Sequence, residues 1–296
     1  MHQLGVAAIV ASLSFANTAV SNAQPSAAPQ CQSSGKLVRV AELPEGSGVA
    51  ISRRSPGRLW AHNDSGTELV ALDAKGSVTG RVRLSGAKIE DWEAIAVGTC
   101  PAGSCVYIGD IGDNQAKRKH VTVYRIAEPA AESSVDVKDT FHATYPDGAQ
   151  DAEALLVAPN GNLFIVTKGE TGSVGLYRFP KELRPGATHQ LERVCKARAS
   201  GKSAETERIT DGAVSPDGTW VVLRTKQSVA FHRASDFFAG NWAEAGRLDL
   251  KATGEAQGEG VAMAADGTVY LTGEGGGKSQ PGTFAKLACS VKAQTR

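Results

Sequence analysis

The chain is poor in the residues that favour long helices and in the apolar runs that cross membranes. Only 6% of its 296 residues are aromatic and 2 are methionine, whereas 33 are glycine. Together with abundant valine, threonine and isoleucine, this composition favours many short β-strands. The one extended apolar run, residues 4–20, is short and rich in alanine and serine. We therefore expect no membrane span.

An excess of either charge is also missing, because the formal net charge at pH 7 is +1. No strong global field attracts nucleic acid or an anionic membrane, so we predict no nucleic-acid partner. The one dense basic run, from Lys117 to His120, lies between two candidate strands. We interpret this run as a solvated loop.

The N-terminal segment has the pattern of a secretory signal peptide. An apolar run of small residues is followed by Ser21-Asn22-Ala23, which fits a small-x-small cleavage site, although His2 is the only basic residue before the run. We therefore predict a signal peptide over residues 1–23, a linker over 24–35 and a single domain over 36–292. The mature protein is expected to be exported, to the periplasm or the extracellular space.

A repeated unit organises the rest of the chain. It begins with a slot residue before a short apolar strand, then a turn and a return strand. The slots are Ser47, Glu93, Glu153, Thr210 and Glu259. Successive slots are about 45 to 60 residues apart, and a four-stranded propeller blade takes roughly 40 to 50 residues before insertions.

Turn chemistry supports the same repeat. Asn160-Gly161, Asp217-Gly218 and Asp266-Gly267 each stand between two apolar strands, where Asn-Gly and Asp-Gly favour tight hairpins. We therefore predict an all-β fold, a β-propeller of five four-stranded blades. Six blades are the alternative.

The last repeat ends early, and an isolated strand candidate over residues 36–43 precedes the first repeat. Pairing this strand with the last blade closes the ring and removes two free sheet edges. We predict this closure and a monomer.

The five cysteines fit the same arrangement. Cys100 and Cys105 flank one hairpin turn, which predicts a local disulfide. Closure of the ring brings Cys31 beside Cys289 and leaves Cys195 over, but a bond between Cys195 and Cys289 is the alternative. In an oxidising compartment an odd number leaves at least one thiol free or paired with another chain. The double CxxC spacing of a zinc site is missing.

Acidic residues gather at the starts of first strands and the ends of second strands, which meet on one face of an antiparallel blade. Crowded carboxylates either bind a cation or have raised pKa values. A set rich in oxygen, without clustered histidine or cysteine, favours calcium. The predicted ligands are Asp91, Glu93, Asp110, Asp113, Asn114, Asp151, Glu153, Asp211 and Glu259.

The structural alternative uses no metal. Asp and Asn at strand ends often accept hydrogen bonds from their own turns, and Lys168 and Arg224 could neutralise the ring of acids. For catalysis, His62 is the candidate general base and Glu153 the candidate carboxylate. Ser47 lacks the spacing of a nucleophile elbow, and the glycine-rich segment at 273–279 lacks that of a phosphate loop.

Two sets of residues resemble known propeller groups. Glu259-Gly260-Val261-Ala262 followed by Asp266-Gly267-Thr268-Val269-Tyr270 resembles regucalcin/gluconolactonase-like, calcium-dependent propellers. Asp151-Ala152-Glu153-Ala154-Leu155 is similar to esterase-like phytase and SdiA-regulated propellers, and the mature chain resembles uncharacterised exported bacterial propellers. The first resemblance implies a calcium ion held by acidic channel residues and hydrolysis of a lactone or phosphoester. Those relatives use six blades, whereas we count five.

Two classes of function follow. The first is a cation-dependent propeller that binds a small molecule, with lactone or phosphoester hydrolase activity. The second is a non-catalytic structural or protein-interaction propeller.

Overall fold

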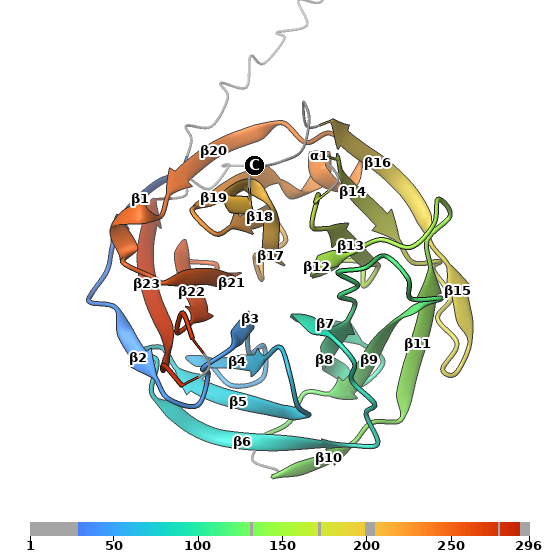
Figure 1. Ribbon diagram of the computed structural model, residues 1–296, viewed down its shortest axis with the longest axis horizontal. Coiled ribbons are helices and arrows are strands. Elements are labelled where there is room, and N and C mark those ends of the chain that lie inside the picture. Colours follow the sequence, from blue (N-terminus) through green and yellow to red (C-terminus); the bar gives the residue numbers. More distant parts are fainter. Residues whose placement is uncertain (1–28, 131–132, 171–172, 199–204, 278, 291–296) are drawn as a thin grey trace, which may run out of the picture.

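The computed structural model describes residues 29–130, 133–170, 173–198, 205–277 and 279–290. The predicted signal peptide lies outside these residues. Five β-sheets stand around a common axis, each with its first strand innermost (Figure 1). The prediction of a five-bladed propeller is therefore confirmed.

The first two blades each have four antiparallel strands in order from the axis outward. Blade 1 is β3 (Gly46–Ile51), β4 (Arg58–Asn63), β5 (Glu68–Asp73) and β6 (Val78–Ser85). Blade 2 is β7 (Trp92–Cys100), β8 (Gly103–Asp110), β9 (Val121–Ala127) and β11 (Asp139–Thr144).

Blades 3 and 4 follow the same plan. Blade 3 is β12 (Ala152–Val157), β13 (Leu163–Thr167), β14 (Ser173–Arg178) and β16 (Glu192–Arg198). Blade 4 is β17 (Ile209–Val214), β18 (Trp220–Thr225), β19 (Ser228–Arg233) and β20 (Glu244–Asp249). The described helices are short: α1 (Ala234–Phe238) and two 3-10 turns, Glu205–Glu207 and Lys251–Thr253. Across the described ranges, no helix is long and apolar enough to cross a membrane.

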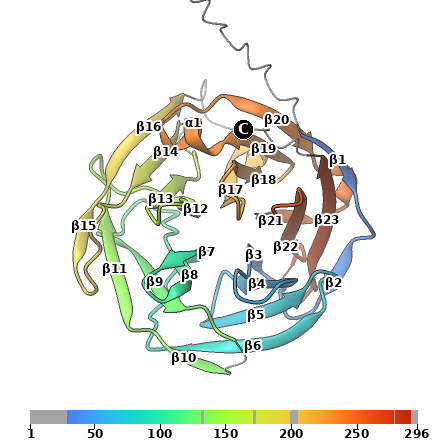
Figure 2. The same cartoon turned by 180° about the vertical axis from the view of Figure 1, so that it is seen from behind.

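Blade 5 joins the two ends of the chain. It contains β21 (Gln257–Met263), β22 (Thr268–Glu274) and β23 (Gly282–Ser290). Two N-terminal strands, β1 (Gln30–Ser33) and β2 (Val38–Val40), pair antiparallel with β23 (Figure 2). The predicted closure is confirmed, and β1 extends it into the segment predicted as a linker.

The disulfides match the predicted pairs. Cys31 is bonded to Cys289 across the closure, Cys100 to Cys105 across the β7–β8 turn, and Cys195 is a free thiol. Two disulfides are typical of proteins in oxidising, non-cytoplasmic compartments.

Two short parallel strands also connect neighbouring blades. β10 (Ser134–Asp136) leaves blade 2 to pair with β6 of blade 1, and β15 (Thr188–Gln190) leaves blade 3 to pair with β11 of blade 2. Each covers an outer strand edge that would otherwise be unpaired.

The core lies between blades rather than inside one layer. Five apolar clusters each join two neighbouring blades, as where Trp60 of β4 and Trp92 of β7 pack in the cluster between blades 1 and 2. Those two indoles are 1% and 0% exposed. This packing fixes the innermost strands relative to one another, and with them the side chains that face the axis.

Candidate functional site

A β-bulge stands at the slot position of every blade. The register shifts by one residue at Ser47 in β3, at Glu93 in β7, at Glu153 in β12 and at Thr210 in β17. In β21 the shift spans Glu259 and Gly260. A bulge places two residues of one strand opposite one residue of its partner and re-aims a side chain. The slots of the sequence repeat are therefore bulge residues at one end of the axis.

The bulges help to bring three glutamates into one cavity, which we call the acidic mouth. Its volume is about 240 Å³. It is lined by Asp64, Glu93, Asn114, Glu153, Lys168, Glu205, Arg208, Thr210, Lys226, Gln257, Glu259 and Glu274. Glu93, Glu153 and Glu259 come from three different blades. Three of the predicted ligands therefore lie in one cavity.

Burial and mutual repulsion keep these glutamates partly protonated. Burial, then the charge of Glu153, raises the pKa of Glu93 well above its ordinary value. Burial raises the pKa of Glu259 to about 7 and that of Glu153 to about 8. Glutamate ordinarily titrates near pH 4.3. Neutral carboxylic acids and carboxylates therefore coexist in this mouth near neutral pH.

Lys168 is the cation closest to the predicted ligands. It follows β13, and its Nζ forms an ion pair with Glu153 Oε1, lies 3.3 Å from Asp151 Oδ2 and donates to Asn114 Oδ1 at 3.4 Å. Burial lowers the pKa of Lys168, but the facing carboxylates outweigh it and the pKa rises. The ammonium thus supplies a positive charge in the predicted cation site.

Asp110 and Asp113 accept hydrogen bonds from nearby backbone N–H groups and from Arg118. Asp110 Oδ1 accepts hydrogen bonds from the Asp91 backbone N at 2.9 Å and from Arg118 Nη1 at 2.9 Å. The two carboxylate oxygens of Asp113 accept from the backbone N–H groups of Lys117 and Arg118, at 2.9 and 2.8 Å. These are the contacts that the structural alternative predicts, in which carboxylates at strand ends accept hydrogen bonds from nearby turns, so we do not propose Asp110 and Asp113 as metal ligands.

Asp91 and Asp151 lie beside the mouth. Asp151 Oδ1 accepts from the Asp113 backbone N at 2.8 Å. Burial, then the charge of Asp151, raises the pKa of Asp91. A Cβ at Gly112 would collide with the Asp91 carboxyl, so a larger residue there would displace the Asp91 side chain.

Asp211 is a structural residue of the inner ring. Its carboxylate is 0% exposed and accepts from the backbone N–H groups of Gly212 at 2.7 Å and Val261 at 2.8 Å, which joins β17 to β21. Burial raises its pKa well above the ordinary value. Arg224 is similarly buried and pairs with Glu255 at 2.7 Å. Neither lines the acidic mouth, so Asp211 is not carried forward as a metal ligand.

His62 lies inside the interface of blades 1 and 2. Its ring stacks on Trp92 with centroids 4.1 Å apart, and it is 0% exposed. Burial lowers its pKa to about 3, so the imidazole is neutral, and His62 is not among the residues that line the acidic mouth. We therefore do not propose His62 as the general base.

Several residues of the mouth were absent from the predicted site. Glu205, Arg208 and Lys226 come from loops or a short 3-10 turn, and nothing in the repeat identifies them. Gln257 and Glu274 face each other across β21 and β22, where Gln257 Nε2 donates to Glu274 Oε1 at 2.6 Å and to Glu259 Oε1 at 2.8 Å. The sequence signal for Glu274 is its position at the end of a second strand, β22.

The predicted ligands already face a cation of the protein's own. Among the described residues, no group of three or more His, Cys, Asp or Glu side chains is placed to hold a metal ion. The Lys168 ammonium lies against Glu153 and Asp151, two of the predicted ligands. Lys168 is therefore the cation that the described residues place against these carboxylates.

Comparisons with known proteins support the fold. No protein-family model matches the chain, and no curated protein sequence matches it. The PQQ-bound aldose sugar dehydrogenase of Streptomyces coelicolor has a similar structure, with TM-score 0.52 and 12% identity over 90% of this chain and 100% of that one. A gluconolactonase of Xanthomonas campestris matches with TM-score 0.50 and 11% identity over 92% and 99%. At such identities the likeness concerns the fold alone.

Proposed function

We propose that this chain is an exported propeller whose acidic mouth binds a small cyclic ester and hydrolyses it by carboxyl acid–base catalysis. The observation that carries the proposal is the meeting of three bulge glutamates from three blades in one cavity. The likeness to a gluconolactonase adds only that the fold is shared.

The three glutamates have different surroundings, which suggests different roles. No hydrogen bond or ion pair of the Glu93 carboxyl occurs in the described parts of the chain, and its raised pKa favours the protonated form. It can therefore donate a hydrogen bond to the carbonyl oxygen of an ester. Glu259, with a pKa of about 7, is half ionised near neutral pH and can accept a proton.

In this scheme water attacks the ester carbonyl carbon while Glu259 takes its proton. Glu93 stabilises the developing oxyanion by a hydrogen bond. The carbon–oxygen bond of the ring then breaks, and the proton on Glu259 passes to the leaving alkoxide. The product is a hydroxy acid. Lys168 holds Glu153 by its ion pair and supplies positive charge beside the developing oxyanion.

The test is hydrolysis of a panel of five- and six-membered lactones by the purified mature chain. We expect Glu93→Gln and Glu259→Gln to lower kcat by about 100-fold or more. Glu182→Gln, at an exposed loop position outside the mouth, is the matched control. Turnover should rise with pH as Glu259 ionises and fall as Glu93 loses its proton. Equal activity of all three variants would refute the roles of Glu93 and Glu259.

A non-catalytic binding propeller is the second candidate. The contacts of Lys168 with Glu153 and Asp151 favour it, because the ammonium gives these carboxyl groups a partner without a substrate. Absence of turnover across the panel, with lactone-dependent protection against thermal unfolding, would select this second function.

Calcium binding stays a prediction from the sequence. Calcium added to chelator-treated protein should leave the melting temperature unchanged if Lys168 is the resident cation. A saturable rise at micromolar calcium would show that a divalent ion displaces the ammonium.

A further inference from the structure

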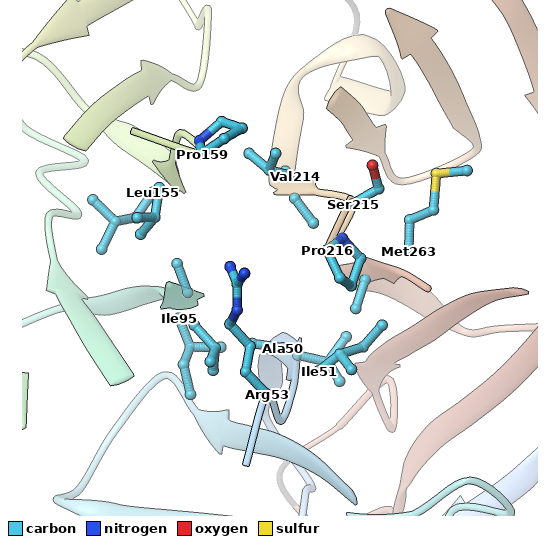
Figure 3. Close-up of a pocket in the computed structure, with 17 residues that line it drawn as sticks. Ala50, Ile51, Arg53, Ile95, Leu155, Pro159, Val214, Ser215, Pro216 and Met263 are labelled. Carbon is cyan, nitrogen blue, oxygen red and sulfur yellow. The ribbon is translucent and has the colours of Figure 1, made fainter. Parts of the chain in front are cut away.

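The opposite end of the axis carries a second cavity of different chemistry, which we call the apolar mouth. Its volume is about 80 Å³. The side chains that carry the argument are Ile51, Leu155, Pro159, Val214 and Met263, with Arg53 among them. The apolar groups come from four blades and surround the opening, and the Arg53 guanidinium projects into its middle (Figure 3).

Arg53 brings an unneutralised charge to this apolar surface. Its guanidinium has no hydrogen bond or ion pair within the described residues, and the side chain is exposed. The neighbouring Arg54 is engaged differently, because its Nη1 donates to the Glu128 carbonyl at 3.0 Å. A lone guanidinium beside a ring of aliphatic groups is complementary to an anion with a short apolar tail.

The loop that carries Arg53 is held firmly in place. Glu128 of blade 2 is 2% exposed, and its carboxylate accepts hydrogen bonds from the Arg53 backbone N at 3.3 Å and the Arg54 backbone N at 3.2 Å. The same carboxylate accepts from Trp60 Nε1 at 3.1 Å and Ser104 Oγ at 2.6 Å. This buried anchor joins the loop to two blades, so the position of Arg53 is pre-organised.

The size of the cavity limits the tail of the ligand. An engineered apolar cavity of about 150 Å³ takes benzene, whereas the apolar mouth measures about 80 Å³. A short unbranched chain fits this space and a ring does not. Each innermost strand also pairs on one side only, so backbone N–H groups on its free edge can add hydrogen bonds to an anion.

We propose that the apolar mouth binds short aliphatic carboxylates, with the chain among Ile51, Pro159 and Val214, beside the buried Met263, and the carboxylate on the Arg53 guanidinium. This site is separate from the acidic mouth and does not depend on the proposed hydrolysis.

Methionine labelling gives a direct probe, because the chain has 2 methionines, Met1 and Met263. Met1 belongs to the predicted signal peptide, so in the mature chain methyl-¹³C methionine reports on Met263 alone. Sodium butyrate, butan-1-ol and butylammonium chloride are titrated at constant ionic strength while the Met263 methyl signal is followed. We expect a saturable shift with butyrate and binding at least about tenfold weaker for the alcohol and the ammonium.

Substitutions test whether butyrate binding needs the positive charge of Arg53. Arg53→Gln should weaken butyrate binding at least about tenfold, since a hydrogen bond to a charged group is lost. Arg39→Gln, at an exposed position on the outer strand β2, should change nothing. Val214→Phe should abolish binding by filling the mouth, and if that variant fails to fold, the exposed Arg53→Gln change decides alone. No saturable shift of Met263, equal binding of butylammonium, or unchanged affinity in Arg53→Gln would overturn the proposal.

Discussion

The two mouths of the axis are built by the same inner strands yet differ in chemistry. At one end the innermost strands carry bulges, and the cavity holds Glu93, Glu153 and Glu259 with the Lys168 ammonium. At the other end the same strands run without a register shift and present Ile51, Val157, Val214 and Met263.

The difference teaches that a bulge, rather than a new element, can separate a polar site from an apolar one. In a regular strand the side chains alternate between the two faces. A bulge interrupts this alternation and lets a residue leave the interface between blades for the axis. Glu93 stands between Trp92 and Ala94, both 0% exposed, and Glu153 between Ala152 and Ala154, also 0% exposed. The bulge therefore lets a carboxyl group stand within an apolar sequence.

The largest expected effect comes from breaking the apolar end. Leu155 is 0% exposed and packs in the cluster between blades 2 and 3 as well as lining the apolar mouth. Leu155→Ala should lower the free energy of unfolding by about 3 kcal/mol through the cavity it leaves. Urea unfolding measures the loss, with the partly exposed Val214→Ala as the milder control. The pH dependence of stability should stay that of the parent chain.

A substitution at the acidic end should lower the free energy of unfolding by a smaller amount, and this loss should depend on pH. Lys168→Met removes the partner of Glu153, and one-sided loss of a buried ion pair costs several kcal/mol. Because Lys168 is 19% exposed at its side chain and Glu153 can take up a proton, we expect about 2 kcal/mol at pH 8 and less at pH 5. Urea titrations at both pH values check this, with the exposed Lys75→Met as control. An equal loss at both pH values would show that the ion pair is not the cause.

The smallest expected effect is the pH dependence of stability that Glu259 gives the unaltered protein. The folded chain holds the Glu259 proton more tightly than the unfolded chain, because burial raises the pKa from 4.5 to about 7. Its stabilising contribution is fully present below about pH 4.5 and is lost as pH rises through 7. Glu259 alone should therefore lower stability by about 1 to 2 kcal/mol between pH 5 and pH 8. Glu259→Gln should flatten this part of the curve, and an unchanged slope would count against the assignment.

Much of the fold could be predicted because its signals are local. Asn160-Gly161 and Asp217-Gly218 mark hairpins, and both glycines have a positive φ, 82° and 71°. The isolated N-terminal strand and the shortened last repeat together indicated the closure. The strands β10 and β15 were not predicted, because each has three residues and no apolar alternation of its own.

The site could be predicted only in part. The local sequence does not tell which carboxylates will accept hydrogen bonds from backbone N–H groups and which will face the cavity. Glu93 and Asp211 both stand at the start of an inner strand. The Asp211 carboxylate binds the backbone of Val261 in the next blade, whereas Glu93 faces the mouth. That distinction depends on the bulge register and on how neighbouring blades are placed. His62 was misplaced for the same reason, since its burial against Trp92 arises only when two blades pack.

The most direct test of the central claim is a carboxyl titration by ¹³C NMR of glutamate-labelled protein, assigned with the three Glu→Gln variants. The account predicts that Glu259 titrates at about 7 and Glu153 at about 8. It also predicts that Glu93 stays protonated well above the ordinary glutamate range. Titration of all three groups near pH 4.3, as in an exposed glutamate, would contradict a mouth that holds neutral carboxylic acids.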